Sequence, residues 1–134
     1  MKKPKTFEEW VTTFVERLSD YFNLAGWSIN ITYQEDNAKD GAYAENKLNS
    51  PYMHSTLILY SQAKKDFESG EMDKLVMAIV HELTHIFLDP LHDFVLPYLS
   101  QTTTPLFADI LEQRTQKLTM VFLKNLPKGT IPPR

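Results

Sequence analysis

The chain has 134 residues, of which 43% are hydrophobic and 12% aromatic, and its net charge is −3. This composition predicts one globular domain over residues 1–134 and gives no basic surface of the kind that binds nucleic acid. The chain contains no cysteine, which excludes disulfides and thiolate zinc sites, so any zinc ion would need His, Asp, Glu or water as ligands.

The first predicted element is a helix with a marked start. The pattern Thr6-x-x-Glu9 is a capping box, and we expect the helix to end between Asn23 and Gly26, where Gly26 permits a left-handed turn. Residues 1–5 are polar and charged and carry no secretory signal pattern, so we expect a loose tail on a cytoplasmic protein. Apolar side chains follow the capping box at the spacing of one helical face: Phe7, Trp10, Val11, Phe14, Leu18, Tyr21 and Phe22.

Strands are predicted in the next third of the chain. Apolar and polar residues alternate from Trp27 to Tyr33, which is typical of a strand with one buried face. Gln34 to Gly41 is predicted to be a loop, Ala42 to Glu45 a weak strand, and Asn46 to Pro51 a turn. Tyr52 to Tyr60 is predicted to be a further strand because it ends in an apolar run.

A second helix with an apolar core-facing side is predicted from Glu71 to Leu88. Acidic residues in its first turn complement the helix dipole, and Asp89-Pro90 is expected to stop it, because the residue before proline avoids helical geometry. Its apolar run, Leu75 to Val80, is too short to cross a membrane. We therefore expect no membrane association.

The last predicted helix starts at Thr104-Pro105, with threonine as the cap and proline in the first turn, and continues to about Leu123. Leu91 to Thr103 is predicted to be a loop, with or without one helical turn, before it, and residues 127–134 a loose proline-rich tail. The elements together predict an α+β fold: a leading helix, a small and mostly antiparallel three-stranded sheet, the helix that contains residues 81–85, and a closing helix.

Residues 81–85 read His81-Glu82-Leu83-Thr84-His85. Two histidines at i and i+4 lie one helical turn apart, so both imidazoles can reach one ion. Glu82 can stand beside that ion and accept a proton from a water bound to it. The pattern predicts a zinc-dependent hydrolase, most simply a peptidase; the alternative is that both histidines serve only packing or surface roles.

This pentapeptide resembles the signature of the zincin metallopeptidases. The element order over residues 7–123 is similar to the minimal zincin-like domains of the SprT and ImmA types and to small phage-encoded metallopeptidases. The resemblance implies a Zn²⁺ site on the helix that contains residues 81–85. It also implies a sheet edge, expected at Tyr52–Tyr60, along which a peptide substrate pairs as an added strand.

The third zinc ligand has several candidates. The metzincin pattern would place glycine and histidine where this chain has Leu88 and Leu91, so the resemblance disfavours that subclass. The gluzincin pattern takes a glutamate from a later helix, and Glu112 fits, although its alternative is an exposed surface glutamate. Its helical neighbours are mostly small, which would allow close helix packing: Ala108, Thr115 and Thr119. His92 is the runner-up ligand, followed by Asp89, Asp93 and Asp109.

Supporting groups are also expected around such a site. A ligand histidine normally donates its other N–H to a carboxylate or carbonyl, and Asp109 is one candidate acceptor. The candidates for stabilising a developing oxyanion are Tyr98, His92 and Arg114. A second hypothesis is a regulatory or binding module that retains a zincin fold around a structural zinc ion without proteolysis.

Overall fold

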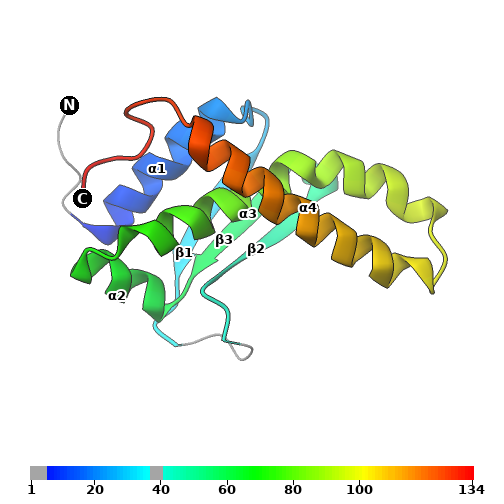
Figure 1. Cartoon of the computed structure of the whole chain (residues 1–134), viewed down its shortest axis with the longest axis horizontal. Coiled ribbons are helices and arrows are strands. Elements are labelled where there is room, and N and C mark those ends of the chain that lie inside the picture. The colour runs from blue at the N-terminus through cyan, green and yellow to red at the C-terminus, as the bar shows by residue number, and fades with distance from the viewer. Residues whose placement is uncertain (1–5, 37–40) are drawn as a thin grey trace.

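The computed structural model describes residues 6–36 and 41–134. Residues 1–5, expected to be a loose tail, and part of the expected 34–41 loop lie outside the described residues. The predicted α+β class is confirmed within the described part, which contains four α-helices and a three-stranded sheet (Figure 1). The elements are α1 (Phe7–Tyr21), β1 (Ser28–Tyr33), β2 (Ala44–Asn49), β3 (His54–Leu59), α2 (Ser61–Ser69), α3 (Met72–Val95) and α4 (Thr103–Asn125), with short 3₁₀ helices η1 (Ser50–Tyr52) and η2 (Leu96–Tyr98).

The sheet has the strand order β1-β3-β2. β1 pairs in parallel with β3, from Ser28 opposite His54 to Tyr33 opposite Leu59, whereas β2 pairs with β3 in antiparallel orientation. The expectation that Tyr52–Tyr60 forms a sheet edge is therefore wrong, because β3 is the central strand and is paired on both sides. The free edges belong to β1 and β2. The burial of three consecutive residues from Leu57 to Leu59 agrees with this central place.

β2 is longer than its sequence indicates. The strand expected at Ala42–Glu45 begins at Ala44 and continues to Asn49, so the expected turn over Asn46–Pro51 is replaced by a strand and then η1. The segment Ala-Glu-Asn-Lys-Leu-Asn lacks the β-branched and aromatic residues that favour strands. Its strand conformation comes from pairing with β3 along its whole length.

α1 begins at the predicted capping box. Thr6 Oγ1 accepts a hydrogen bond from the Glu9 amide at 3.1 Å, and Glu9 Oε2 accepts one from the Thr6 amide at 3.3 Å. The helix ends at Tyr21, and the left-handed residue that follows is Asn23, with φ of 56°, rather than Gly26 as expected. Asparagine tolerates this conformation. Glycine at position 26 instead leaves room for Met53, whose Cε would lie 2.7 Å from an added Cβ.

α3 does not stop at Asp89-Pro90, contrary to the prediction, but continues through an exposed Pro90 to Val95. The expected Leu91–Thr103 loop is thus mostly helix, with η2 completing the connection to α4. The proline removes one backbone donor, but packing against α4 supports the extension: the His92 ring stacks on Phe107 with centroids 6.1 Å apart. The last part of α3 and the first part of α4 project beyond the sheet as a helical hairpin (Figure 1).

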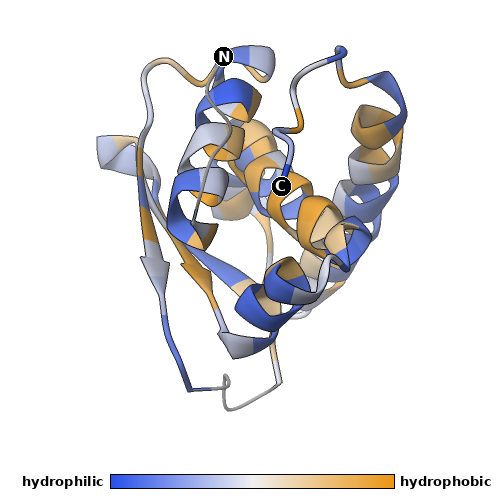
Figure 2. Ribbon diagram, turned by 90° about the vertical axis from the view of Figure 1, so that its left-hand side faces the viewer, coloured by the Kyte–Doolittle hydropathy of each residue, from blue (hydrophilic) through white to orange (hydrophobic). Residues whose placement is uncertain are grey.

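The hydrophobic core lies between the sheet and the helices α1, α2 and α3. In Figure 2 the hydrophobic segments gather in the interior, and the outward-facing helical turns are mostly hydrophilic. The helical hairpin contributes little to this core, since Phe94 is 73% exposed at its tip. Among the described helices, none has the length and apolar character needed to cross a membrane. The large side chains with less than 2% exposure are Trp10, Phe14, Leu18, Leu57, Leu59, Leu75, Ile79, Leu83 and Ile86.

Residues 127–134, expected to be a loose tail, are held against α1 and α2 (Figure 1). The buried Trp10 indole donates its N–H to the Pro132 carbonyl at 2.9 Å, and Arg17 donates to the Gly129 carbonyl at 2.7 Å. Arg134 donates to the carbonyl of Phe67 at the end of α2. A buried indole N–H requires an acceptor, and the proline-rich segment supplies it.

Candidate metal centre

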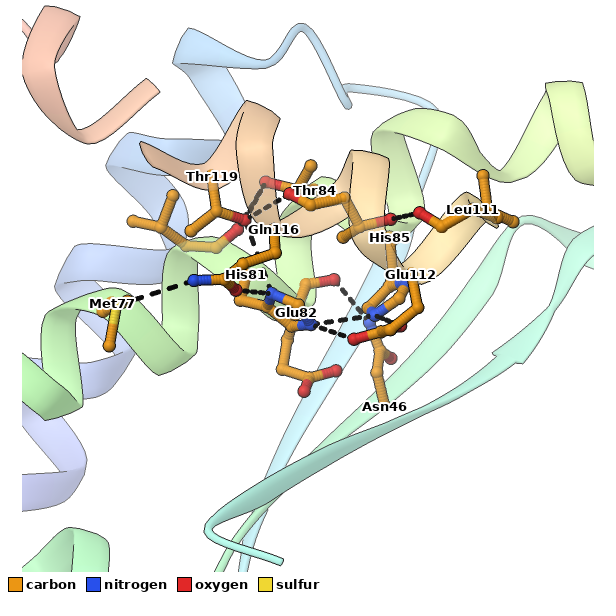
Figure 3. Close-up of polar contacts among 12 residues, drawn as sticks. Asn46, Met77, His81, Glu82, Thr84, His85, Leu111, Glu112, Gln116 and Thr119 are labelled. Carbon is orange, nitrogen blue, oxygen red and sulfur yellow. Dashed lines mark hydrogen bonds and ion pairs between the residues drawn. The ribbon is translucent and has the colours of Figure 1, made fainter. Parts of the chain in front are cut away.

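α3 presents His81 and His85 on one side, one turn apart, while its opposite side is fixed in the core by Val80 and Leu83. Both imidazoles are half-buried, and their Nε2 atoms lie 3.1 Å apart (Figure 3). The helix spacing in the sequence thus produces the predicted convergence of the two rings. The sequence places both rings correctly because the buried residues between them allow only one orientation of the helix.

α4 brings Glu112 to the same point. Its Oε1 lies 2.9 Å from His81 Nε2, and its Oε2 lies 3.2 Å from His85 Nε2. The approach of α4 depends on small residues: Thr115 and Thr119 are fully buried, and Thr119 Oγ1 lies 3.5 Å from Thr84 Oγ1 of α3. The structure therefore brings together the three residues that the sequence put forward as ligands.

These three side chains fit a zinc ion. Ligand atoms 2.0–2.2 Å from zinc in tetrahedral geometry are separated from one another by about 3.3–3.6 Å. The three separations here are 3.1, 2.9 and 3.2 Å, so small side-chain movements would admit the ion. Two histidines and one glutamate are also a donor set that catalytic zinc sites use. The Glu112 side chain is 58% exposed, so one side of the cluster is open to solvent.

Gln116 fixes the orientation and the tautomer of His81. Its Oε1 lies 2.9 Å from His81 Nδ1, and because an amide oxygen can only accept, Nδ1 carries the proton and donates. The lone pair of Nε2 then points at Glu112 and His85, where a cation would separate it from the carboxylate. Asp109, the expected partner of a ligand histidine, lies exposed on α4 instead. Gln116 follows Glu112 by one helical turn, a spacing that points to Gln116 only once Glu112 is known to face His81.

His85 and Glu82 have shifted pKa values. Burial lowers the pKa of His85, which keeps its imidazole neutral and able to bind a metal. Burial, followed by the negative charges of Glu112 and of Glu45 on β2, raises the pKa of Glu82 to about 8. A side chain with a pKa near neutrality is suited to accepting and returning a proton.

The sheet contacts the backbone of Glu82 through a hydrogen bond from β2. Asn46 of β2 donates its side-chain N–H to the backbone carbonyl of Glu82 at 3.0 Å, and its side-chain oxygen Oδ1 accepts a hydrogen bond from the buried Ser55 of β3. Sequence reasoning missed Asn46 because it assigned this position to a turn. These contacts fix β2 beside the helix that carries the two histidines.

The other sequence candidates lie elsewhere. His92, the runner-up ligand, is near Asp93 at 3.6 Å and belongs to a separate group with Asp89 on the next turns of α3. Tyr98 is 81% exposed in η2 at the hairpin tip, and Arg114 is exposed on α4. Neither lines the cavity beside the cluster, whereas His92 does.

A cavity of about 450 Å³ adjoins the cluster of His81, His85 and Glu112. It extends along the second half of α3 between β2 and α4, with His85 and Glu112 in its wall. Comparison of the chain with known protein families, with curated proteins and with solved structures finds no match. The cluster and this cavity are therefore the features of the chain that bear on its function.

Proposed function

We propose that the protein is a zinc-dependent peptidase in which His81, His85 and Glu112 bind the metal ion and Glu82 acts as the proton acceptor and donor. The observation that supports this proposal most strongly is the convergence of three ligand atoms from α3 and α4 at mutual distances of 2.9–3.2 Å. Zinc as cofactor and action in the cytoplasm are part of the same proposal.

Bound zinc would supply Lewis acidity, polarising the attacked carbonyl and lowering the pKa of the attacking water to about 7. Glu82 would accept a proton from that water and return it to the leaving amine nitrogen. Gln116 would keep the His81 Nε2 lone pair directed at the metal.

A peptide is the substrate class that best fits the surroundings of the cluster. β2 is an edge strand, and two of its residues face the site: Asn46 contacts the Glu82 carbonyl, and Leu48 lines the cavity. An extended peptide that pairs with β2 as an added strand would pass directly beside His85. This edge replaces the Tyr52–Tyr60 strand in that role.

The open side of the cluster favours a hydrolytic over a structural zinc ion. A closed structural site uses four protein ligands, whereas three candidate ligands converge here among the described residues and the exposed Glu112 leaves one side accessible. If the protein were instead a regulatory or binding module with a structural zinc ion, chelation would lower its melting temperature strongly, and no metal-dependent cleavage would be detected.

The test is cleavage of a mixed-sequence peptide library by the zinc-loaded protein, by a chelated sample and by Glu82→Gln. We expect cleavage to require zinc, and Glu82→Gln to retain zinc but to lose at least about 1,000-fold in rate. Glu71→Gln, an exposed change of the same charge at the start of α3, is the matched control and should cleave normally. Wild-type rates in Glu82→Gln would contradict the mechanism.

A further inference from the structure

The cavity beside the metal cluster combines apolar walls with acidic groups. Its apolar residues come from three elements: Leu48 of β2, Leu88 of α3, and Ala108 and Leu111 of α4. Besides Glu112, two carboxylates line it, those of Asp89 and Asp93, and its described lining contains neither lysine nor arginine. Such a cavity suits a ligand with an apolar stem and a positive end.

Asp89 is the unusual member of this lining. It follows His85 by four residues, so it lies one turn further along the same side of α3, and it is only 6% exposed. Within residues 6–36 and 41–134, its carboxyl group has no hydrogen-bond or ion-pair partner. Side-chain oxygen and nitrogen atoms that are sealed from solvent in this part of the chain all have partners. The Asp89 carboxyl group therefore reaches open space, and the space it lines is the cavity.

The other two carboxyl groups that line the cavity, those of Asp93 and Glu112, have histidine partners nearby. Asp93 Oδ1 lies 3.6 Å from His92 Nδ1 and is near the protein surface, and Glu112 belongs to the metal cluster. Asp89 is the buried member of this lining, and among the described residues no hydrogen bond or ion pair reaches its carboxyl group. A buried polar group without a partner is costly. A positively charged group of a ligand would supply that partner.

We propose that this cavity binds the side chain of a lysine or arginine residue next to the scissile peptide bond, with Asp89 pairing with its charge. This inference rests on the proposed peptidase function and names its substrate class. The methylene stem would lie along Leu48, Leu88 and Leu111, and the ammonium or guanidinium group would reach Asp89. His85 and Glu112 in the same wall place the peptide backbone of that residue at the metal cluster.

A divalent ion is the competing occupant, because Asp89, His92 and Asp93 offer ligand atoms within 4.8 Å of one another. The lining favours a side chain instead. A second hydrated ion would need only the acidic end of the cavity, and the apolar walls between that end and the metal cluster would have no ligand to contact. Metal content distinguishes the two occupants directly.

The test uses two fluorescently labelled five-residue alanine peptides that carry either lysine or norleucine in the centre. Their binding to the zinc-loaded Glu82→Gln protein is measured by anisotropy, and their cleavage is measured with the active protein. We expect the lysine peptide to bind at least tenfold more tightly than the norleucine peptide. Adding Asp89→Asn should remove this preference and leave norleucine binding unchanged.

Asp109→Asn is the matched control, since it removes the same charge from an exposed position on α4 and should preserve the lysine preference. Equal binding of both peptides to the parent protein, or a preference that survives Asp89→Asn, would overturn the inference. Two metal ions per chain, with the second lost in Asp89→Asn, would also overturn it. Asp89-dependent lysine binding without zinc-dependent cleavage would instead overturn the peptidase proposal and leave the lysine-binding cavity standing.

Discussion

The two halves of α3 differ in how they are held. Before Asp89 the helix is anchored in the core, where Leu75, Ile79, Leu83 and Ile86 are all less than 2% exposed. After Asp89 no residue of α3 is buried, and Phe94 is 73% exposed. His81 and His85, two of the three proposed metal ligands, lie on the anchored half, whereas the cavity continues along the exposed half.

This difference separates two requirements of the proposed site. Metal ligands must be held within about 0.5 Å of their working geometry, and the core around Leu83 provides that for His81 and His85. A binding cavity tolerates more movement, and its far wall is built from the helical hairpin. Glu112 depends on both regions, because the first part of α4 belongs to the hairpin, whereas further along α4 the buried Thr115 and Thr119 pack against the anchored half of α3.

The largest expected difference between the halves is in stability. Leu83→Ala should lower the free energy of unfolding by about 3 kcal/mol, because it leaves a cavity in a fully buried site. Phe94→Ala should change it by less than about 0.5 kcal/mol, since the side chain is mostly in solvent. Urea unfolding of the metal-free proteins measures both. Similar losses in the two variants would show that the hairpin is as tightly packed as the core.

A smaller effect on stability is expected at Pro90, where the two halves of α3 meet. Pro90→Ala should raise the free energy of unfolding by about 1–2 kcal/mol, because alanine can donate to the Ile86 carbonyl and removes the steric conflict of a proline inside a helix. Pro90 is exposed, so few side-chain contacts are lost. Hydrogen exchange of the amides of residues 91–95 should slow in the same variant. A loss of stability would mean that the proline shapes the hairpin in a way that alanine cannot.

The anchored half could be predicted from the sequence, because local signals and tertiary packing agree there. The Thr6 capping box and the apolar periodicity of α1 and α3 defined both helices. The same periodicity fixed the side of α3 on which His81 and His85 lie. Glu112 was put forward from a family resemblance and from its small neighbours, and the structure places it beside both histidines.

The remaining features depend on contacts between distant residues. Asp89-Pro90 is a local stop signal that packing of α3 on α4 overrides. The polar strand β2 exists because β3 pairs with it, and residues 127–134 are held because the buried Trp10 needs an acceptor. Gln116 could be recognised only after Glu112 was known to face His81, since glutamine on a helix has many possible roles.

The central claim is that His81, His85 and Glu112 bind one zinc ion, and metal content with zinc affinity tests it most directly. We predict one zinc per chain in the wild-type protein and in His92→Ala, and at least a 100-fold weaker affinity in Glu112→Ala. Asp109→Asn, an exposed change on the same helix as Glu112, should bind zinc like the wild type. A wild-type protein that binds no zinc, or a Glu112→Ala variant with unchanged affinity, would contradict the account.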